Sequence, residues 1–236
     1  MLFRSLKIRQ TTDKPDQFLF TGLFAQIGRN GKVMNTNLEN CDITLDSSGK
    51  YSAGTNATGG LAGMSYGVVA NCSVSGTIEG IFGVGGLIGE SGWGSRVEGC
   101  SVKVSVIGNA SVGALVGSLH NALVTDCEAE GEVIAAKKTG GSVTPRGIGG
   151  FSGFMVMGTV RDCRSSVFVK TMISADWVGG FMGYNQGEII NCLYDKNKTA
   201  NWEAVDVVYQ DSLSDVRDIA ENDPDVPDSP SQSESS

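Results

Sequence analysis

Apolar and polar residues alternate strictly in several short stretches of the chain. After Cys100, Val102 and Val104 fall on one face, whereas the residues between them are polar. The stretches that follow Cys72 and Cys127 repeat this pattern. A period of two residues is typical of a β-strand with one buried face and one solvent-exposed face. The pattern therefore predicts a series of short strands.

These strands belong to a longer repeat that has two parts. The first part is a glycine-rich signature of the Gly-Gly-Leu-Ile-Gly kind, with copies at 59–63, 85–89, 113–117, 149–153 and 179–183 and a weaker copy at 21–25. The second part is a short motif that begins with Val or Ile and ends at Thr36, Cys72, Cys100, Cys127, Cys163 or Cys192. Successive copies of this motif are 36, 28, 27, 36 and 29 residues apart.

A unit of this length has room for about three short strands, which cannot bury their apolar face alone. Stacking the units at about 4.8 Å per coil completes both the backbone hydrogen bonds and the core. The sequence therefore predicts an all-β fold, a right-handed parallel β-helix (β-solenoid) of about six coils with roughly 28 residues per coil. A propeller is disfavoured, because its blades need about 40 residues or more.

The repeat also sets the expected domain boundaries. We expect the solenoid to cover 18–200, after an N-terminal cap over 1–17 that includes Leu2, Leu6 and Ile8. A C-terminal cap over 201–221 would contain a short helix over 214–221, with Ser214 as its N-cap. The segment 222–236 is dominated by Pro, Asp and Ser, so we expect a disordered acidic tail.

Charge is distributed unevenly along the chain. The net charge is −8. Residues 203–236 contain ten acidic residues and one basic residue, whereas residues 1–202 contain sixteen acidic and seventeen basic residues. A nearly neutral body argues against nucleic acid as a partner. No apolar run reaches the roughly 18 residues that span a bilayer, so membrane insertion is not expected.

The two signatures resemble the GLUG motif, a short repeat named for its Gly-Leu-x-Gly core. Gly60–Gly63 and Gly86–Gly89 carry that core, and Gly187–Cys192 carries the downstream Gly-x-[Val/Ile]-x-Asn-Cys pattern. The resemblance covers about 20–195, with departures at Ala25, Thr36, Ala114 and Ala122. It implies large secreted or surface-anchored bacterial proteins, including adhesin-like proteins and non-catalytic regions of immunoglobulin A-cleaving metallopeptidases.

The resemblance favours an extracellular or cell-surface location. No secretory signal is visible in residues 1–10, and the repeat starts as early as Phe18. We therefore expect the sequence to begin after a signal or within a longer chain.

Five cysteines occupy one position of the repeat: Cys72, Cys100, Cys127, Cys163 and Cys192. A ladder of buried, reduced thiols is the favoured interpretation, because small apolar side chains suit an interior stack. Disulfides are the alternative, but parallel Cβ directions and an odd number of members argue against them. Cys41 lies out of register. Zinc is disfavoured, because no pairs with Cys-x-x-Cys spacing occur.

Catalytic chemistry is sparse. Asp126 and Asp162 would lie side by side as a carboxylate pair, but capping of corner amides is the favoured role for them. His120 is the single histidine, which excludes a His-Glu-x-x-His metallopeptidase helix. We expect no catalytic residue, no cofactor and no metal. Calcium on Glu128, Glu130 and Glu132 is an alternative that their flat row disfavours.

Two features could bind a partner. The long coils carry extra length at 46–57, with Tyr51, and at 134–147, with Lys137, Lys138 and Arg146. The corner after each glycine signature carries aromatic or apolar residues, which predicts one exposed column of Tyr66, Trp93, His120, Phe154–Met157 and Tyr184. Tolerated insertion and corner packing are the structural alternatives for the two features.

The favoured function is a non-enzymatic bacterial surface or secreted scaffold, an adhesin-like module. A glycan-binding module that uses the aromatic column is the alternative, and a β-helix polysaccharide lyase or hydrolase is less favoured. The expected partner is a host or bacterial surface protein or a glycan. The repeat further predicts two outward columns, Lys103 with Glu130 and Ser166, and Ser101 with Glu128 and Arg164.

Overall fold

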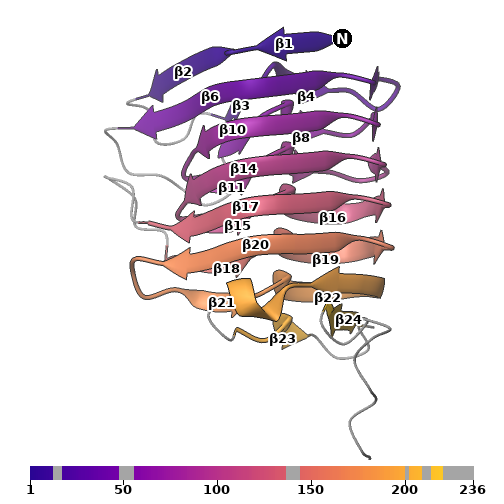
Figure 1. The fold of residues 1–236 in the computed structure, drawn as a ribbon. Coiled ribbons are helices and arrows are strands. Elements are labelled where there is room, and N and C mark those ends of the chain that lie inside the picture. The colour runs from indigo at the N-terminus through magenta and orange to yellow at the C-terminus, as the bar shows by residue number, and fades with distance from the viewer. Residues whose placement is uncertain (13–17, 48–55, 137–143, 200–201, 209–213, 220–236) are drawn as a thin grey trace, which may run out of the picture.

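The computed structural model describes residues 1–12, 18–47, 56–136, 144–199, 202–208 and 214–219. The chain winds through stacked coils whose strands lie one above another (Figure 1). Every pairing between the described strands is parallel. The protein is therefore a parallel β-solenoid, as the repeat predicts.

Each coil contributes strands to three stacks. The first stack contains β1 (Leu2–Arg4), β2 (Lys7–Thr12), β6 (Asn37–Ser47), β10 (Ser73–Glu79), β14 (Ser101–Gly108), β17 (Glu128–Ala135) and β20 (Arg164–Thr171). The second is a six-stranded sheet of β3 (Leu19–Thr21), β7 (Asn56–Gly59), β11 (Phe82–Gly85), β15 (Ala110–Gly113), β18 (Arg146–Gly149) and β21 (Asp176–Gly179).

The third stack follows the glycine signature. It contains β4 (Phe24–Ile27), β5 (Lys32–Met34), β8 (Ala62–Ser65), β9 (Val68–Ala70), β12 (Ile88–Ser91), β13 (Arg96–Glu98), β16 (Val116–Thr125), β19 (Ser152–Arg161) and β22 (Met182–Tyr194). The last elements are the 3₁₀ turn η1 (Lys196–Lys198), β23 (Val205–Val208) and β24 (Ser214–Asp218).

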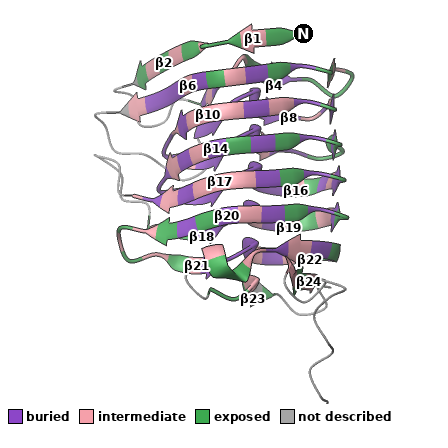
Figure 2. Ribbon diagram, viewed as in Figure 1, coloured by how far each residue is buried: buried purple, intermediate pink, exposed green. Residues whose placement is uncertain are grey.

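The register of the first stack agrees with the columns expected from the sequence. Lys103 lies opposite Glu130, and Glu130 lies opposite Ser166. Ser101, Glu128 and Arg164 form the neighbouring column. In Figure 2 buried positions alternate with more exposed ones along these strands. Because the side-chain period is two, this register turns Cys127 into the core, where it is 2% exposed.

The glycine signature folds each coil into a V whose tip enters the core. A Cβ atom on Gly89 would lie 2.7 Å from the carbonyl oxygen of Gly83, so the arms of the V approach each other backbone to backbone. The residues at the tips are fully buried: Leu61, Leu87, Leu115, Phe151 and Phe181. Phe151 and Phe181 stack at 4.7 Å between ring centroids. The small residues therefore bring β11 and β12, and their equivalents, into contact.

The helix predicted over 214–221 is wrong, because β24 occupies Ser214–Asp218. Val216 pairs with Cys192 and Arg217 pairs with Leu193, both on β22. The exposed edge of β22 offers unpaired backbone groups, and pairing with them outweighs the local N-cap signal of Ser214. At the other end, β1 and β2 extend the ladder by pairing with β6.

The segment expected to cover the C-terminal end contributes β23, which pairs with Met182, Tyr184 and Asn185 of β22. Val205 packs against the core, whereas Trp202 is 37% exposed. The tail over 222–236 lies outside the described residues.

Candidate functional site

The corners before the ladder cysteines share one backbone conformation. Their φ angles are positive, between 51° and 60°, at Asn35, Asn71, Gly99, Asp126, Asp162 and Asn191. Asn, Asp and Gly tolerate this left-handed region better than other residues. The polar residues are therefore selected first by backbone geometry. Asp162 also accepts a hydrogen bond of 2.6 Å from the Asn191 amide, so the side chains connect neighbouring corners.

The ladder thiols close these corners from the inside. Each thiol donates to the carbonyl oxygen two residues earlier, at 3.1 Å for Cys127 and Cys163 and at 3.4 Å for Cys192. The backbone amide of Cys72 in turn donates to the sulfur of Cys100 at 3.4 Å. All five ladder cysteines are buried and free of disulfides, as is Cys41. A small apolar side chain with a weak donor therefore suits this position.

Burial makes the thiols of Cys163 and Cys41 poor nucleophiles. It raises the pKa of Cys163 far above the ordinary thiol value and raises the pKa of Cys41 to about 11. Cys163 and Cys41 are therefore protonated at neutral pH and face the interior. The described residues include no group of three or more His, Cys, Asp and Glu side chains placed to hold a metal.

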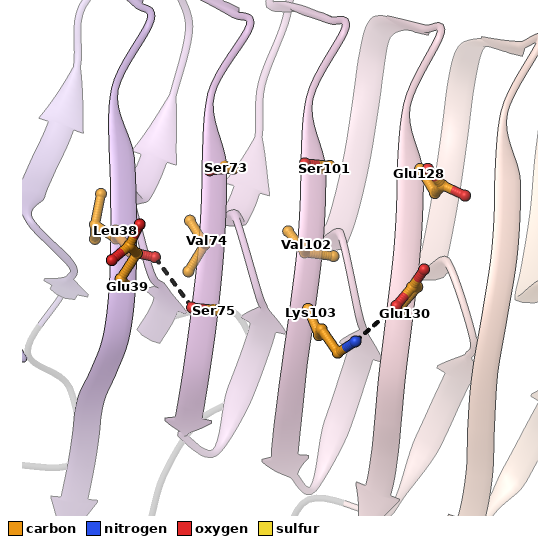
Figure 3. A pocket seen from close by; sticks show the side chains of 10 residues that line it. All are labelled: Leu38, Glu39, Ser73, Val74, Ser75, Ser101, Val102, Lys103, Glu128 and Glu130. Carbon is orange, nitrogen blue, oxygen red and sulfur yellow. Dashed lines mark hydrogen bonds and ion pairs between the residues drawn. The ribbon is translucent and has the colours of Figure 1, made fainter. Parts of the chain in front are cut away.

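The outward face of the first stack carries charged side chains around a shallow hollow of about 300 Å³. Figure 3 shows Lys103 and Glu130 directed toward each other across neighbouring strands, and their charged atoms are 3.3 Å apart. Farther along, the Lys170 ammonium donates to Glu132 at 2.8 Å. Glu130 and Glu132 are thus each paired with a cation from an adjacent coil. The face is thus a set of local ion pairs rather than a field of one sign.

The predicted aromatic column does not form as one unit. Phe154 and Tyr184 lie opposite each other in register, and their rings stack at 4.7 Å. Tyr66 lies beside Gly92 and Trp93 is 56% exposed in a turn. The reason is the offset from the last glycine of each signature. Phe154 and Tyr184 follow it by one residue, whereas the other members follow it by three or four.

A tryptophan from the other arm of the V completes the aromatic cluster. The Trp177 ring lies 5.0 Å from Tyr184 and 6.3 Å from Phe154. Trp177 has a φ of 57°, at the repeat position that Gly83, Ser111 and Gly147 occupy in earlier coils. Sequence reasoning missed it. Aligning the residue two positions before each Gly-Gly or Gly-Ala pair would have shown a tryptophan among small residues.

The aromatic cluster ends at Phe154, and two serines of the preceding coil leave a pocket beside it. The residue opposite Phe154 on the preceding coil is Ser118, and Ser111 stands in the Trp177 column. The resulting cavity has a volume of about 210 Å³. We call it the serine-gap pocket, and it is lined by Phe82, Glu90, Ser111, Ser118, His120, Arg146, Phe154 and Trp177. Phe154 stacks on Tyr184, and the His120 ring of the preceding coil lies 6.4 Å from the Phe154 ring.

Charged groups lie at the sides of the serine-gap pocket. His120 Nε2 lies 3.6 Å from Glu90 Oε1 on the preceding coil. The Arg146 guanidinium lies over the Trp177 ring, 5.2 Å from its centroid. The pocket therefore combines an open aromatic face with one carboxylate, one imidazole and one guanidinium, a composition typical of sites for small polar ligands.

The other binding candidates lie elsewhere. Tyr51, Lys137 and Lys138 fall outside the described residues. Arg146 begins β18 and is the one candidate from the two long insertions that the structure places in the pocket. Asp126 and Asp162 are exposed at successive corners, on a different part of the coil from the pocket.

Comparison with protein families matches residues 108–134 to the GLUG motif. This stretch includes Ser111, Ser118 and His120. Comparisons with curated proteins and with solved structures gave no match. The chain therefore combines a GLUG motif with a parallel β-solenoid. No helix among the described residues is long and apolar enough to span a membrane.

Proposed function

We propose that this chain is a non-enzymatic, adhesin-like module of a bacterial surface or secreted protein, and that it binds a sugar ring in the serine-gap pocket. The observation that carries the proposal is the end of the aromatic stack, where Phe154 and Ser118 line one cavity. The apolar face of a sugar ring stacks on such an aromatic face while its hydroxyls reach polar neighbours.

The dimensions favour a single ring. Coils stack at about 4.8 Å, so the small side chain of Ser118 leaves a space of about 10 Å between Phe154 and Glu90, its neighbours in the column. One ring in van der Waals contact fits such a gap. Glu90, His120 and Arg146 line the same cavity and can donate to or accept from ring substituents. A terminal or pendant sugar therefore suits the pocket better than a continuous internal chain.

The solenoid supplies rigidity. Phe154 and Tyr184 are on β19 and β22, which are held by neighbouring coils through parallel ladders. A site on strands is already ordered before the ligand arrives, which lowers the entropic cost of binding. The GLUG motif supports a location outside the cell, because proteins with this repeat are typically secreted or surface-anchored.

A glycan array tests the proposal, with the wild-type protein beside Phe154→Ala and Trp93→Ala. Trp93 is an exposed aromatic that does not line the pocket. We expect the wild type and Trp93→Ala to bind the same glycans and Phe154→Ala to lose them. A blank array, or binding that Phe154→Ala retains in full, would contradict sugar binding at this pocket. Retained binding to a surface protein alone would favour protein adhesion instead.

A further inference from the structure

The serine-gap pocket has a carboxylate on one side and a guanidinium on the other. Glu90, on β12, already has a side-chain partner in His120 on β16, whose Nε2 lies 3.6 Å from the Glu90 carboxylate. Arg146, on β18, is exposed, and no carboxylate of the described residues lies within 4.0 Å of its guanidinium. The available positive charge is therefore at the β18 side of the cavity, next to the aromatic cluster.

Trp177 fixes the orientation of this cation. The Arg146 guanidinium lies 5.2 Å from the centroid of the Trp177 ring. Guanidinium groups stack on aromatic faces, and this contact leaves the N–H groups at their edge free to bind a partner. Two parallel N–H groups match the two oxygens of a carboxylate. An arginine that is oriented by stacking and has no carboxylate partner can therefore bind the carboxylate of a ligand.

The neighbouring acids define where a ligand carboxylate would lie. Glu90 would repel it from the β12 side of the cavity. Asp176 is the cross-strand neighbour of Arg146 on β21, and it competes for the same cation. Asp176 nevertheless forms no ion pair with Arg146 within 4.0 Å. The parallel N–H groups of the Arg146 guanidinium therefore remain available to a ligand carboxylate in the pocket.

We propose that the serine-gap pocket selects an acidic sugar, whose ring stacks on Phe154 and whose carboxylate pairs with Arg146. This inference rests on the proposed sugar binding and adds its chemical class. The carboxylate could belong to a uronic acid of a polysaccharide or to a terminal nonulosonic acid, and both would present the same group to Arg146.

Calorimetric titration tests the selection with three probes: galacturonic acid, N-acetylneuraminic acid and neutral galactose. We expect at least one acidic probe to bind roughly tenfold or more tightly than galactose, because a charge-assisted pair discriminates by that order. Which acid binds identifies the source of the carboxylate. Arg146→Gln should remove the preference for the acidic probe over galactose, and Arg146→Lys should restore part of that preference.

A matched variant removes the competing acid. Asp176→Asn should tighten acidic-sugar binding by a few fold, because it relieves local repulsion. Equal affinity for acidic and neutral sugars, unaffected by Arg146→Gln, would overturn the acidic selection and leave sugar binding intact. Absence of binding by all probes, together with a blank glycan array, would overturn both.

Discussion

The hydroxyl of Thr36 and the thiol of Cys72 make the same contact in successive coils. Thr36 donates to the carbonyl oxygen of Met34 at 3.2 Å, and Cys72 donates to that of Ala70 at 3.2 Å. In both cases the donor follows a left-handed Asn and closes the corner from inside. The one departure from cysteine in the ladder thus keeps the donor, which indicates that hydrogen bonding, not redox chemistry, is what the position requires.

This equivalence predicts the effect of two isosteric replacements at Cys100. Cys100→Thr retains a donor for the Glu98 carbonyl, which the thiol contacts at 3.3 Å. Cys100→Val has the same shape without it. We expect the Thr variant to be more stable by about 0.5–1.5 kcal/mol, the net value of one hydrogen bond. Urea unfolding of both variants measures the difference, and a Val variant of equal or greater stability would contradict it.

The fold was predictable because the two-part signature recurs six times along the chain. Val102, Ala129 and Ser165 occupy one inward column, and their spacing from the cysteines is constant, so the register follows from counting. The end of the chain was not predictable in this way. Ser214 carries a helix N-cap signal, but the edge of β22 provides a long-range strand partner that no local pattern reveals.

The site was predictable only in part. Phe154, Tyr184, His120 and Arg146 stood among the sequence candidates, whereas Trp177 did not. Trp177 reaches the cluster from the opposite arm of the V, so its proximity depends on a bend that brings two strands back to back. Trp93 was predicted to belong to the aromatic column because it is aromatic, although its offset from the last glycine of the signature differs from that of Phe154 and Tyr184. Offsets distinguish columns, whereas residue type alone does not.

An unpartnered hydroxyl in the core offers a stabilising substitution. Ser165 is 1% exposed, and its Oγ has no hydrogen-bond partner among the described residues. The equivalent position on β17 is Ala129. Ser165→Ala should therefore raise the free energy of unfolding by about 1 kcal/mol. The reason is that it removes a buried hydroxyl whose hydrogen bonds to water are lost on folding and are not replaced.

Ser105→Ala serves as the control for that substitution. Ser105 lies on the outward face and donates to Glu132 at 3.0 Å, so removing its hydroxyl should give no stabilisation. Denaturant unfolding compares the two variants. Destabilisation by Ser165→Ala would show that the hydroxyl has a partner, such as an interior water.

The pH dependence of Glu132 follows from its cation. The Lys170 ammonium, and secondarily the Ser105 hydroxyl, hold the pKa of the Glu132 carboxyl below its usual value. Because the folded-state pKa is depressed, the stabilisation is present above the unfolded-state pKa and is lost as the pH falls through the folded-state value. The pair is partly exposed, so its contribution at neutral pH should be only ~0–1 kcal/mol.

Glu132→Gln should accordingly lower stability slightly at pH 7 and leave it unchanged well below the carboxyl range. Unfolding curves at both pH values, repeated in high salt, measure the difference. A penalty that is constant with pH would show that Glu132 acts through packing instead of charge.

Replacing Trp177 should abolish sugar binding with little change in the stability of the protein. Its positive φ costs about 1–3 kcal/mol for a residue with a Cβ atom, and Gly83 and Gly147 occupy the same position in other coils. Trp177→Gly relieves that cost while it removes a half-buried ring, so we expect stability within about 1 kcal/mol of the wild type. Sugar binding should be lost, because both the aromatic wall and the support of Arg146 disappear. A large loss of stability would instead make Trp177 a structural residue.

A larger side chain at Ser118 would fill the serine-gap pocket and should block sugar binding there. Ser118→Phe continues the column of Phe154 and Tyr184 by one coil and occupies the cavity. The measurement is calorimetric titration of the wild type and the variant with whichever sugar binds the wild type, after thermal unfolding has shown that the variant is folded. We expect a folded Ser118→Phe protein, of at least wild-type stability, that no longer binds the sugar. A folded variant that binds the sugar with wild-type affinity would contradict the serine-gap pocket as the binding site.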